Sequence, residues 1–294
     1  MVSLSSEFIK GFKRSFQRWT ILLAFGTAMI PSFFIFKAGK RLPLRENGYV
    51  VKIIAENVNP PLPLELSAQA EVLFLFLVIL VGANAIRDEL RKKAGESSVV
   101  DLRYFLGKFV GHAVLFSVAS IISVLIDAVL LIYVGAPSSR VLLKDVLLEG
   151  MVFSLMVIQL LALGYLLSTV SSETSTPLIL ALVAMYVIFV TVPMAVEFML
   201  YLTYAPMGEL VKDPRIVDAE VRTLVTRYLF FEPNLQMSEI ISGAWEGGEK
   251  YIGMSFALRK GIYNIANLLV MSVIYLCPAA FRVYRSSKKN PEYR

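Results

Sequence analysis

The stretch FVGHAVLFSVASIISVLIDAVLLIYV, residues 109–134, decides the fold class. A helix needs about 17–25 apolar residues to cross the roughly 30 Å hydrocarbon core of a bilayer, and this stretch is long enough. His112 and Asp127 are its only residues of the types Asp, Glu, His, Lys and Arg. Five other stretches are similar, so we expect an all-α polytopic membrane protein. Its six transmembrane helices are predicted over about residues 20–36, 70–86, 109–134, 147–170, 177–202 and 262–281.

The composition excludes several classes of protein. Of the 294 residues, 56% are apolar and 18% are charged, and the mean hydropathy is +0.66. An ordinary soluble domain is roughly 45–50% apolar and about 25% charged. A disordered chain, a disulfide scaffold and most soluble enzymes are therefore excluded. Because Cys277 and His112 are the only residues of their types, an internal disulfide, a cysteine-based zinc site and a multi-histidine metal site are excluded too.

The basic residues predict the orientation of the chain in the membrane. Lys and Arg number 29 against 23 Asp and Glu, which gives a formal charge of +6. In a membrane protein such an excess reports topology and anionic lipid headgroups rather than nucleic acid. Lys and Arg are about twice as dense in one set of segments as in the other, which predicts cytoplasmic N- and C-termini. The predicted cytoplasmic segments are 1–19, 87–108, 171–176 and 282–294, and the outer ones are 37–69, 135–146 and 203–261.

Residues 1–19 are predicted to form a cytoplasmic amphipathic helix at the membrane interface, preceding a six-helix transmembrane domain of residues 20–294. Apolar residues recur there at helical spacing, with basic residues between them. The alternative is a positively charged flank that only sets the topology. The apolar positions are Phe8, Ile9, Phe12, Phe16 and Trp19.

The cytoplasmic segment 87–108 separates the second and third spans and carries a charged run. These side chains cannot pack against lipid, so the run is either a docking helix for a soluble partner or a solvated turn. Gly107 and Gly111 form a small-xxx-small pair that lets another helix approach closely. The charged residues are Arg87, Asp88, Glu89, Arg91, Lys92 and Lys93.

The outer loop 203–261 is too long for a simple connection. Its apolar residues recur at helical spacing, and we expect one or two amphipathic helices folded back on the outer membrane face. A small folded cap with no direct role in transport is the alternative. Prolines within the spans, at Pro31, Pro193 and Pro278, predict kinks.

Three carboxylates fall at a similar outer depth in the predicted spans: Glu71, Asp127 and Glu197. Ionisable groups in lipid are costly, which makes them candidates for an outer translocation pathway. Separate extension of each side chain into the headgroup region is the alternative. We expect His112 to be a packing residue. Four amides are expected to form hydrogen bonds between helices, namely Asn84, Gln159, Asn264 and Asn267.

Common catalytic motifs are missing from the sequence. It contains no G-x-x-x-x-G-K-[ST], so the chain binds no ATP through a P-loop of its own. It also lacks H-E-x-x-H and G-x-S-x-G, which disfavours an enzyme. An intramembrane enzyme would require Glu71, Asp127 and Glu197 to converge on one pocket.

Several short motifs occur in an order that resembles the type-2 permease family of ABC transporters. Glu89 lies in the charged run after the second span, and Gly95 follows it. Leu106-Gly107-Lys108 then begins the third span. Ser168 ends the Leu-rich run in LGYLLSTVSSETSTP after the fourth span, and Pro233 lies in FFEPN before the last span.

The resemblance implies a membrane-spanning permease subunit of an ABC exporter in the plasma membrane. Two such subunits, identical or different, would form the pathway. Each would place residues 87–108, its coupling segment, on a separate ATPase subunit, with Glu89 meeting basic or hydrogen-bonding groups there. ATP and Mg²⁺ would bind that ATPase, and this chain would hold no cofactor. A non-transporting membrane scaffold or assembly factor, and an intramembrane enzyme, are the alternatives.

Overall fold

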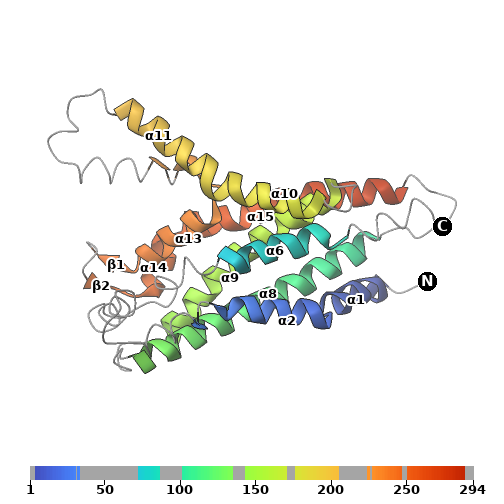
Figure 1. Ribbon diagram of the computed structural model, residues 1–294, viewed down its shortest axis with the longest axis horizontal. Helices are drawn as coiled ribbons and strands as arrows, with labels where there is room; N and C mark the ends of the chain where they lie inside the picture. Colours follow the sequence, from blue (N-terminus) through green and yellow to red (C-terminus); the bar gives the residue numbers. More distant parts are fainter. Residues whose placement is uncertain are drawn as a thin grey trace.

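The computed structural model describes a bundle of helices with one small β-hairpin (Figure 1). It covers residues 4–30, 32–33, 72–86, 101–134, 143–170, 176–204, 224–225, 227–246 and 250–288. The elements in chain order are α1 (Leu4–Ser15), α2 (Arg18–Ala28), α6 (Val72–Asn84), α8 (Leu102–Val134), α9 (Leu143–Val170), α10 (Thr176–Tyr186), the π-helix η2 (Val187–Thr191), α11 (Val192–Tyr204), α13 (Pro233–Ser242), β1 (Trp245–Glu246), β2 (Lys250–Tyr251), α14 (Met254–Lys260) and α15 (Ile262–Lys288).

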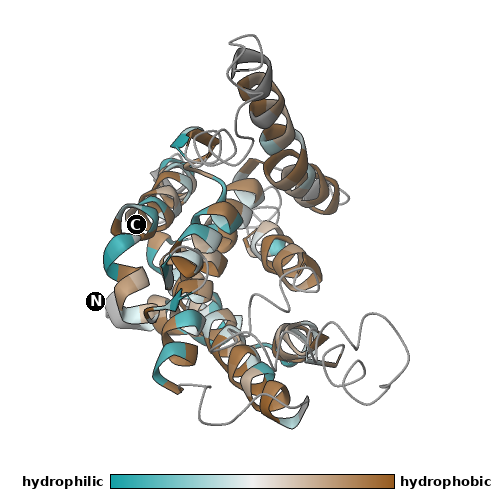
Figure 2. Ribbon diagram, turned by 90° about the vertical axis from the view of Figure 1, so that its left-hand side faces the viewer, coloured by the Kyte–Doolittle hydropathy of each residue, from teal (hydrophilic) through white to brown (hydrophobic). Residues whose placement is uncertain are grey.

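Four helices of the described part of the chain are long and apolar enough to cross a membrane. They are α8, α9, the continuous run α10–η2–α11 and α15, and each coincides with a predicted span. Hydrophobic residues dominate these ribbons in Figure 2. The chain is therefore an all-α membrane protein. The first and second predicted spans are represented by shorter helices, α2 with 11 residues and α6 with 13.

Helix α9 forms the centre of the bundle. In its most apolar stretch 72% of the residues are buried, against 6% in the span Leu178–Leu200. It packs against α6, α8 and α15. At the crossing with α6 the two backbones touch, because a Cβ on Gly164 would lie 2.5 Å from the carbonyl oxygen of Ile79 and one on Gly82 would lie 2.9 Å from the Cα of Gly164. Only glycine fits at these two positions.

Helix α1 packs in the same way against the start of α8 (Figure 1). A Cβ on Gly107 would collide with the carbonyl oxygen of Phe8, and one on Gly11 would collide with that of Tyr104. Gly111 faces the buried Ser15, whose hydroxyl donates to the carbonyl oxygen of Lys108 at 2.9 Å. The helix that approaches the small-xxx-small pair is thus the N-terminal one.

Helix α1 ends at Ser15, before the predicted boundary at residue 19, and a new helix begins at Arg18. The buried side of α1 is formed by small residues, whereas its Phe8 and Ile9 remain exposed. Helix α8 begins at Leu102 rather than near residue 109. This early start fits the packing on α1, because Gly107, which the close approach of α1 requires, lies within residues 102–108.

A short π-helix, η2, interrupts the fifth predicted span directly before Pro193. Proline has no backbone N–H and its ring clashes with the carbonyl four residues earlier, so the regular hydrogen-bond ladder cannot continue there. The Thr191 hydroxyl donates to the carbonyl oxygen of Tyr186 at 3.4 Å, five residues back. Beyond this point α11 projects away from the other helices (Figures 1 and 2). In α15 the helix continues through Pro278, and Pro31 lies outside the described residues.

The described parts of the predicted cytoplasmic segments lie at one end of the bundle. This end, called here the N-terminal end, holds α1, the start of α8 and the ends of α6, α9 and α15 (Figure 1). Arg282 donates there to the carbonyl oxygen of Thr169 at 3.5 Å. The β-hairpin lies at the opposite end, called here the hairpin end, where β1 pairs antiparallel with β2.

The Gly82–Gly164 contact gives a direct test of the packing. Gly164→Ala should lower the free energy of unfolding by about 1–3 kcal/mol, because the added methyl group forces α6 and α9 apart. Thermal unfolding in detergent measures the effect. Gly26→Ala is the matched control, since a Cβ there meets nothing within 4 Å and alanine favours the helix. Equal destabilisation by both changes would contradict the contact.

Candidate functional site

The three candidate pathway acids are not all within the described residues. Glu71 lies outside them, and Glu197 belongs to α11. Helix α11 lies away from α8, which carries Asp127, in both views of the bundle (Figures 1 and 2). The described structure thus does not bring the helix of Glu197 to the surroundings of Asp127.

Asp127 belongs to α8, and its side chain contacts the helical residues that follow α2. Its side chain is fully buried, and its Oδ1 accepts a hydrogen bond of 2.5 Å from the hydroxyl of Ser32. One turn earlier, the Ser123 hydroxyl donates to the carbonyl oxygen of Ala28. Asp127 Oδ2 has no partner among the described residues. These contacts make Asp127 a buried connection between two helices.

A second polar contact lies halfway along α9. The Gln159 amide donates to the carbonyl oxygen of Phe231 at 2.7 Å. Gln159 follows Leu143 by sixteen residues, which is about 24 Å along the helix axis. The chain before α13 therefore lies deep beside α9. From there α13 leads back to the hairpin end, where Tyr251 contacts the first turn of α9.

Pro233 and Glu232 begin helix α13 at this depth. Proline at the first helical position needs no N–H, and the Glu232 carboxylate caps the helix by accepting from the backbone N–H groups of Leu235 and of Asn234, the latter at 3.2 Å. The buried Gln236 accepts from Asn267 of α15 at 3.2 Å. The amides predicted at positions 159 and 267 thus connect α9 and α15 to the loop before the last span.

The hairpin end holds two buried acids of α9, Asp145 and Glu149, one turn apart. The Tyr251 hydroxyl of β2 donates to Asp145 Oδ2 at 2.5 Å. Burial and the neighbouring Asp145 carboxylate raise the pKa of Tyr251 above its ordinary value. The hydroxyl thus stays protonated at neutral pH and holds the hairpin on the first turn of α9.

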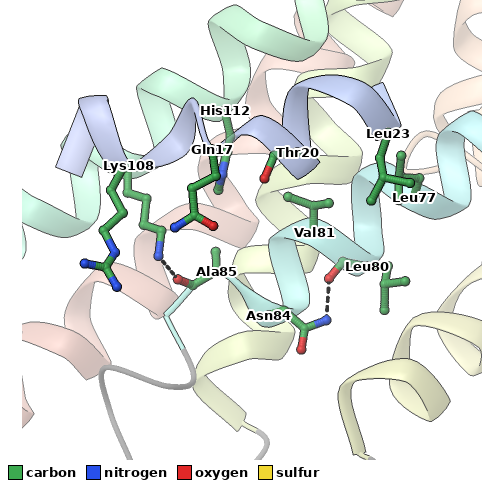
Figure 3. A pocket seen from close by; sticks show the side chains of 11 residues that line it. Gln17, Thr20, Leu23, Leu77, Leu80, Val81, Asn84, Ala85, Lys108 and His112 are labelled. Atoms are coloured by element: carbon green, nitrogen blue, oxygen red, sulfur yellow. Dashed lines mark hydrogen bonds between the residues drawn. The ribbon is translucent and has the colours of Figure 1, made fainter. Parts of the chain in front are cut away.

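The N-terminal end contains an aromatic cluster and a buried lysine. His112 Nδ1 lies 2.8 Å from the hydroxyl of Tyr165, whose ring also packs edge-on against Phe105 and Phe109. His112 is thus a packing residue of the α8–α9 contact. The Lys108 ammonium donates to the carbonyl oxygen of Ala85, at the end of α6 (Figure 3). This bond joins the two ends of the charged segment that connects α6 to α8.

The charged residues of the predicted docking run lie outside the described residues. This applies to Arg87, Asp88, Glu89, Arg91, Lys92 and Lys93. The structure does describe the residues on either side of them. Ile86 is completely buried, and Asp101 precedes α8 directly. Both flanks of the run are therefore fixed to the N-terminal end of the bundle.

Sequence reasoning missed three buried acids, Asp145, Glu149 and Glu232. Glu149 carried a usable signal, because it lies within the predicted fourth span and follows Asp145 by one helical turn. Glu232 precedes a proline that can begin a helix, which is a capping pattern. Asn84 donates to the carbonyl oxygen of Leu80 in its own helix, and Asn264 is half-buried in α15.

The Tyr251–Asp145 bond can be tested by removing one oxygen atom. Tyr251→Phe should lower the free energy of unfolding by about 1.5–3 kcal/mol, since a hydrogen bond to a charged group is lost in a half-buried place. Tyr263→Phe, at a side chain that is 80% exposed, should change it by less than about 0.5 kcal/mol. Thermal unfolding compares the two, and identical values would contradict the role of the hairpin contact.

Comparison with known proteins identifies the family. Residues 103–289, well over half of the chain, match the family described as ABC-2 family transporter protein. No curated protein matches the chain. The matched region runs from the start of α8 to the end of α15 and contains all four candidate spans. The chain thus belongs to the ABC-2 transporter family and is a transmembrane permease of the ABC transporter class.

Proposed function

We propose that the chain is the permease subunit of an ABC exporter, driven by a separate ATPase subunit that docks on residues 87–108. The direction of transport follows from the resemblance to the type-2 permeases. A P-loop is missing from the sequence, so ATP and Mg²⁺ bind the partner. The observation that carries the proposal is the way the ends of the docking segment are held.

The docking segment is attached to the bundle at both ends. It follows Ile86, which is completely buried, and it ends at Lys108, whose ammonium bonds to the carbonyl oxygen of Ala85. The same turn of α8 is fixed to α1 by Gly107 and by the Ser15 hydroxyl. A force applied to the segment therefore reaches α1, α6 and α8 together.

This attachment supports a rigid-body mechanism. Closure of two ATPase subunits around ATP would displace the docking segments, and each segment would move its bundle as one body. Glu89 accepts hydrogen bonds from the ATPase groove, while the basic residues meet its acidic rim. Those basic residues are Arg87, Arg91, Lys92 and Lys93.

The proposed topology has six spans, with both termini in the cytoplasm and the protein in the plasma membrane. Helices α2 and α6 belong to the first and second spans. The described parts of the predicted cytoplasmic segments share the N-terminal end of the bundle, which supports an even number of crossings (Figure 1). Helix α1 then lies at the cytoplasmic interface, where the exposed Phe8 and Ile9 contact lipid. At the hairpin end, α13 and α14 form a re-entrant unit.

The span Leu178–Leu200 is the proposed contact between two permease subunits. Only 6% of its residues are buried within the chain, although every other candidate span is at least 22% buried. Its exposed face is apolar and includes Met194 and Phe198. A second copy, or a related permease, packing there would enclose a pathway between the two bundles.

Docking through Glu89 is tested by purifying the chain with its bound ATPase. Glu89→Ala should reduce the copurifying ATP hydrolysis by about ten-fold, because a charge-assisted hydrogen bond is lost. The matched control is Glu246→Ala, an exposed acid in the hairpin at the opposite end, which should retain full activity. Unchanged activity in the Glu89 variant would show that this segment is not the docking site. A wild-type chain without any ATP-hydrolysing subunit would favour a membrane scaffold instead.

The subunit contact is tested by cysteine cross-linking in a Cys277→Ser background. Phe198→Cys, on α11, should give a cross-linked dimer in native membranes upon oxidation, because its side chain is 64% exposed on the proposed contact face. Val129→Cys, on α8, is equally exposed at 65% but lies outside that face and should remain monomeric. Cross-linking of the two variants to the same extent would indicate random collision and contradict the contact.

A further inference from the structure

A pocket of about 450 Å³ opens at the N-terminal end of the bundle, between α1, α2, α6 and α8 (Figure 3). The subunit contact does not use it, and Lys108 at the end of the docking segment is one of its lining residues. Its lining changes in character from one end to the other. Basic and polar side chains lie at one end and aliphatic ones at the other.

The basic end of the pocket is formed by Arg14 and Lys108, with Gln17 beside them. Lys108 and Gln17 lie on the same side of the pocket in Figure 3. Arg14 is exposed and has no hydrogen bond or ion pair among the described residues. Among the described residues that line the pocket there is no carboxylate. This end therefore carries positive charge and fits an anion.

The aliphatic end of the pocket is formed by Leu23 of α2 and by Leu77, Leu80 and Val81 of α6. Leu23 is 46% exposed, so this wall is open to the surroundings of the bundle. From Val81 to Leu77 the aliphatic wall extends over four residues of α6, which is about 6 Å of helix, and it leads away from the basic end at Ala85. Such a length fits part of a hydrocarbon chain that runs from the end of a membrane helix toward the bilayer centre.

We propose that this pocket binds an anionic phospholipid. The phosphate lies beside Arg14 and Lys108, and one acyl chain lies along Leu23, Leu77 and Leu80. The two ends of the pocket match the two ends of this ligand. A guanidinium pairs well with phosphate, and basic residues next to a membrane helix attract anionic headgroups. A soluble phosphate compound would leave the aliphatic wall without a partner.

The proposal goes beyond the transport function and does not depend on it. The bound lipid sits against Ala85 and Lys108, the two residues that join the ends of the docking segment. It would therefore connect the membrane surface to α1, α6 and α8 at the place where they meet. Lipid binding at this pocket and ATPase docking at Glu89 are measured separately. Either one can therefore fail while the other holds.

Native mass spectrometry of the full chain in uncharged detergent tests the basic end. The chain is titrated with phosphatidylglycerol or phosphatidylcholine carrying the same acyl chains. The wild type should bind phosphatidylglycerol at least about five-fold more tightly, as expected for a basic residue at the headgroup. Arg14→Gln should remove most of this preference. Lys13→Gln is the matched control, because Lys13 is exposed on the same helix but does not line the pocket.

A second pair of variants tests the aliphatic end. Leu23→Ser should weaken the binding of both lipids, whereas Leu22→Ser should not, since Leu22 is 63% exposed but lies outside the pocket. Chain-free glycerol 3-phosphate should fail to displace the lipid. Equal affinity for the two lipids, equal effects of Arg14→Gln and Lys13→Gln, or displacement by glycerol 3-phosphate would overturn the proposal. Unchanged thermal unfolding without lipid shows that the variants fold.

Discussion

The bundle depends on direct contact between helix backbones. In lipid, apolar helices gain little from hiding their side chains from one another, so close approach and dispersion contacts must hold them together. Gly82 and Gly164 bring α6 against α9, and Gly11 and Gly107 bring α1 against α8. Where glycines allow this approach, short polar side chains also reach across, as Ser15 reaches the carbonyl oxygen of Lys108.

Polar contacts at three levels along α9 fix the elements around it. At the hairpin end Asp145 holds Tyr251, halfway along Gln159 holds the chain before α13, and at the N-terminal end Tyr165 meets His112. Each contact joins α9 to a different part of the chain. A buried polar group in an apolar bundle needs such a partner, which makes the position of each element specific. The proposed mechanism requires this stiffness, because a docking segment can move only what is attached to it.

The sequence predicted the long spans well, because an apolar run of sufficient length has few alternatives to a membrane helix. It also indicated that Gly107 and Gly111 form a small face. It could not identify α1 as the partner, since the spacing of glycines contains no information about which helix approaches. Asp127 was conspicuous as an acid in an apolar run, whereas its partner Ser32 was not, because serine is common in such runs. Glu149 was overlooked because it lies at the edge of a predicted span. A charged residue at such a position is usually assigned to the segment that flanks the span.

When the docking segment is displaced, α1 and α8 should move as one body, because both are attached to its ends. Spin labels at Lys13→Cys in α1 and Val129→Cys in α8, in a Cys277→Ser background, measure it by double electron–electron resonance. On addition of ATP to the chain with its ATPase, the distance between the labels within one subunit should stay constant. The distances between labels of the two subunits should change. A change within one subunit as large as that between subunits would contradict the claim.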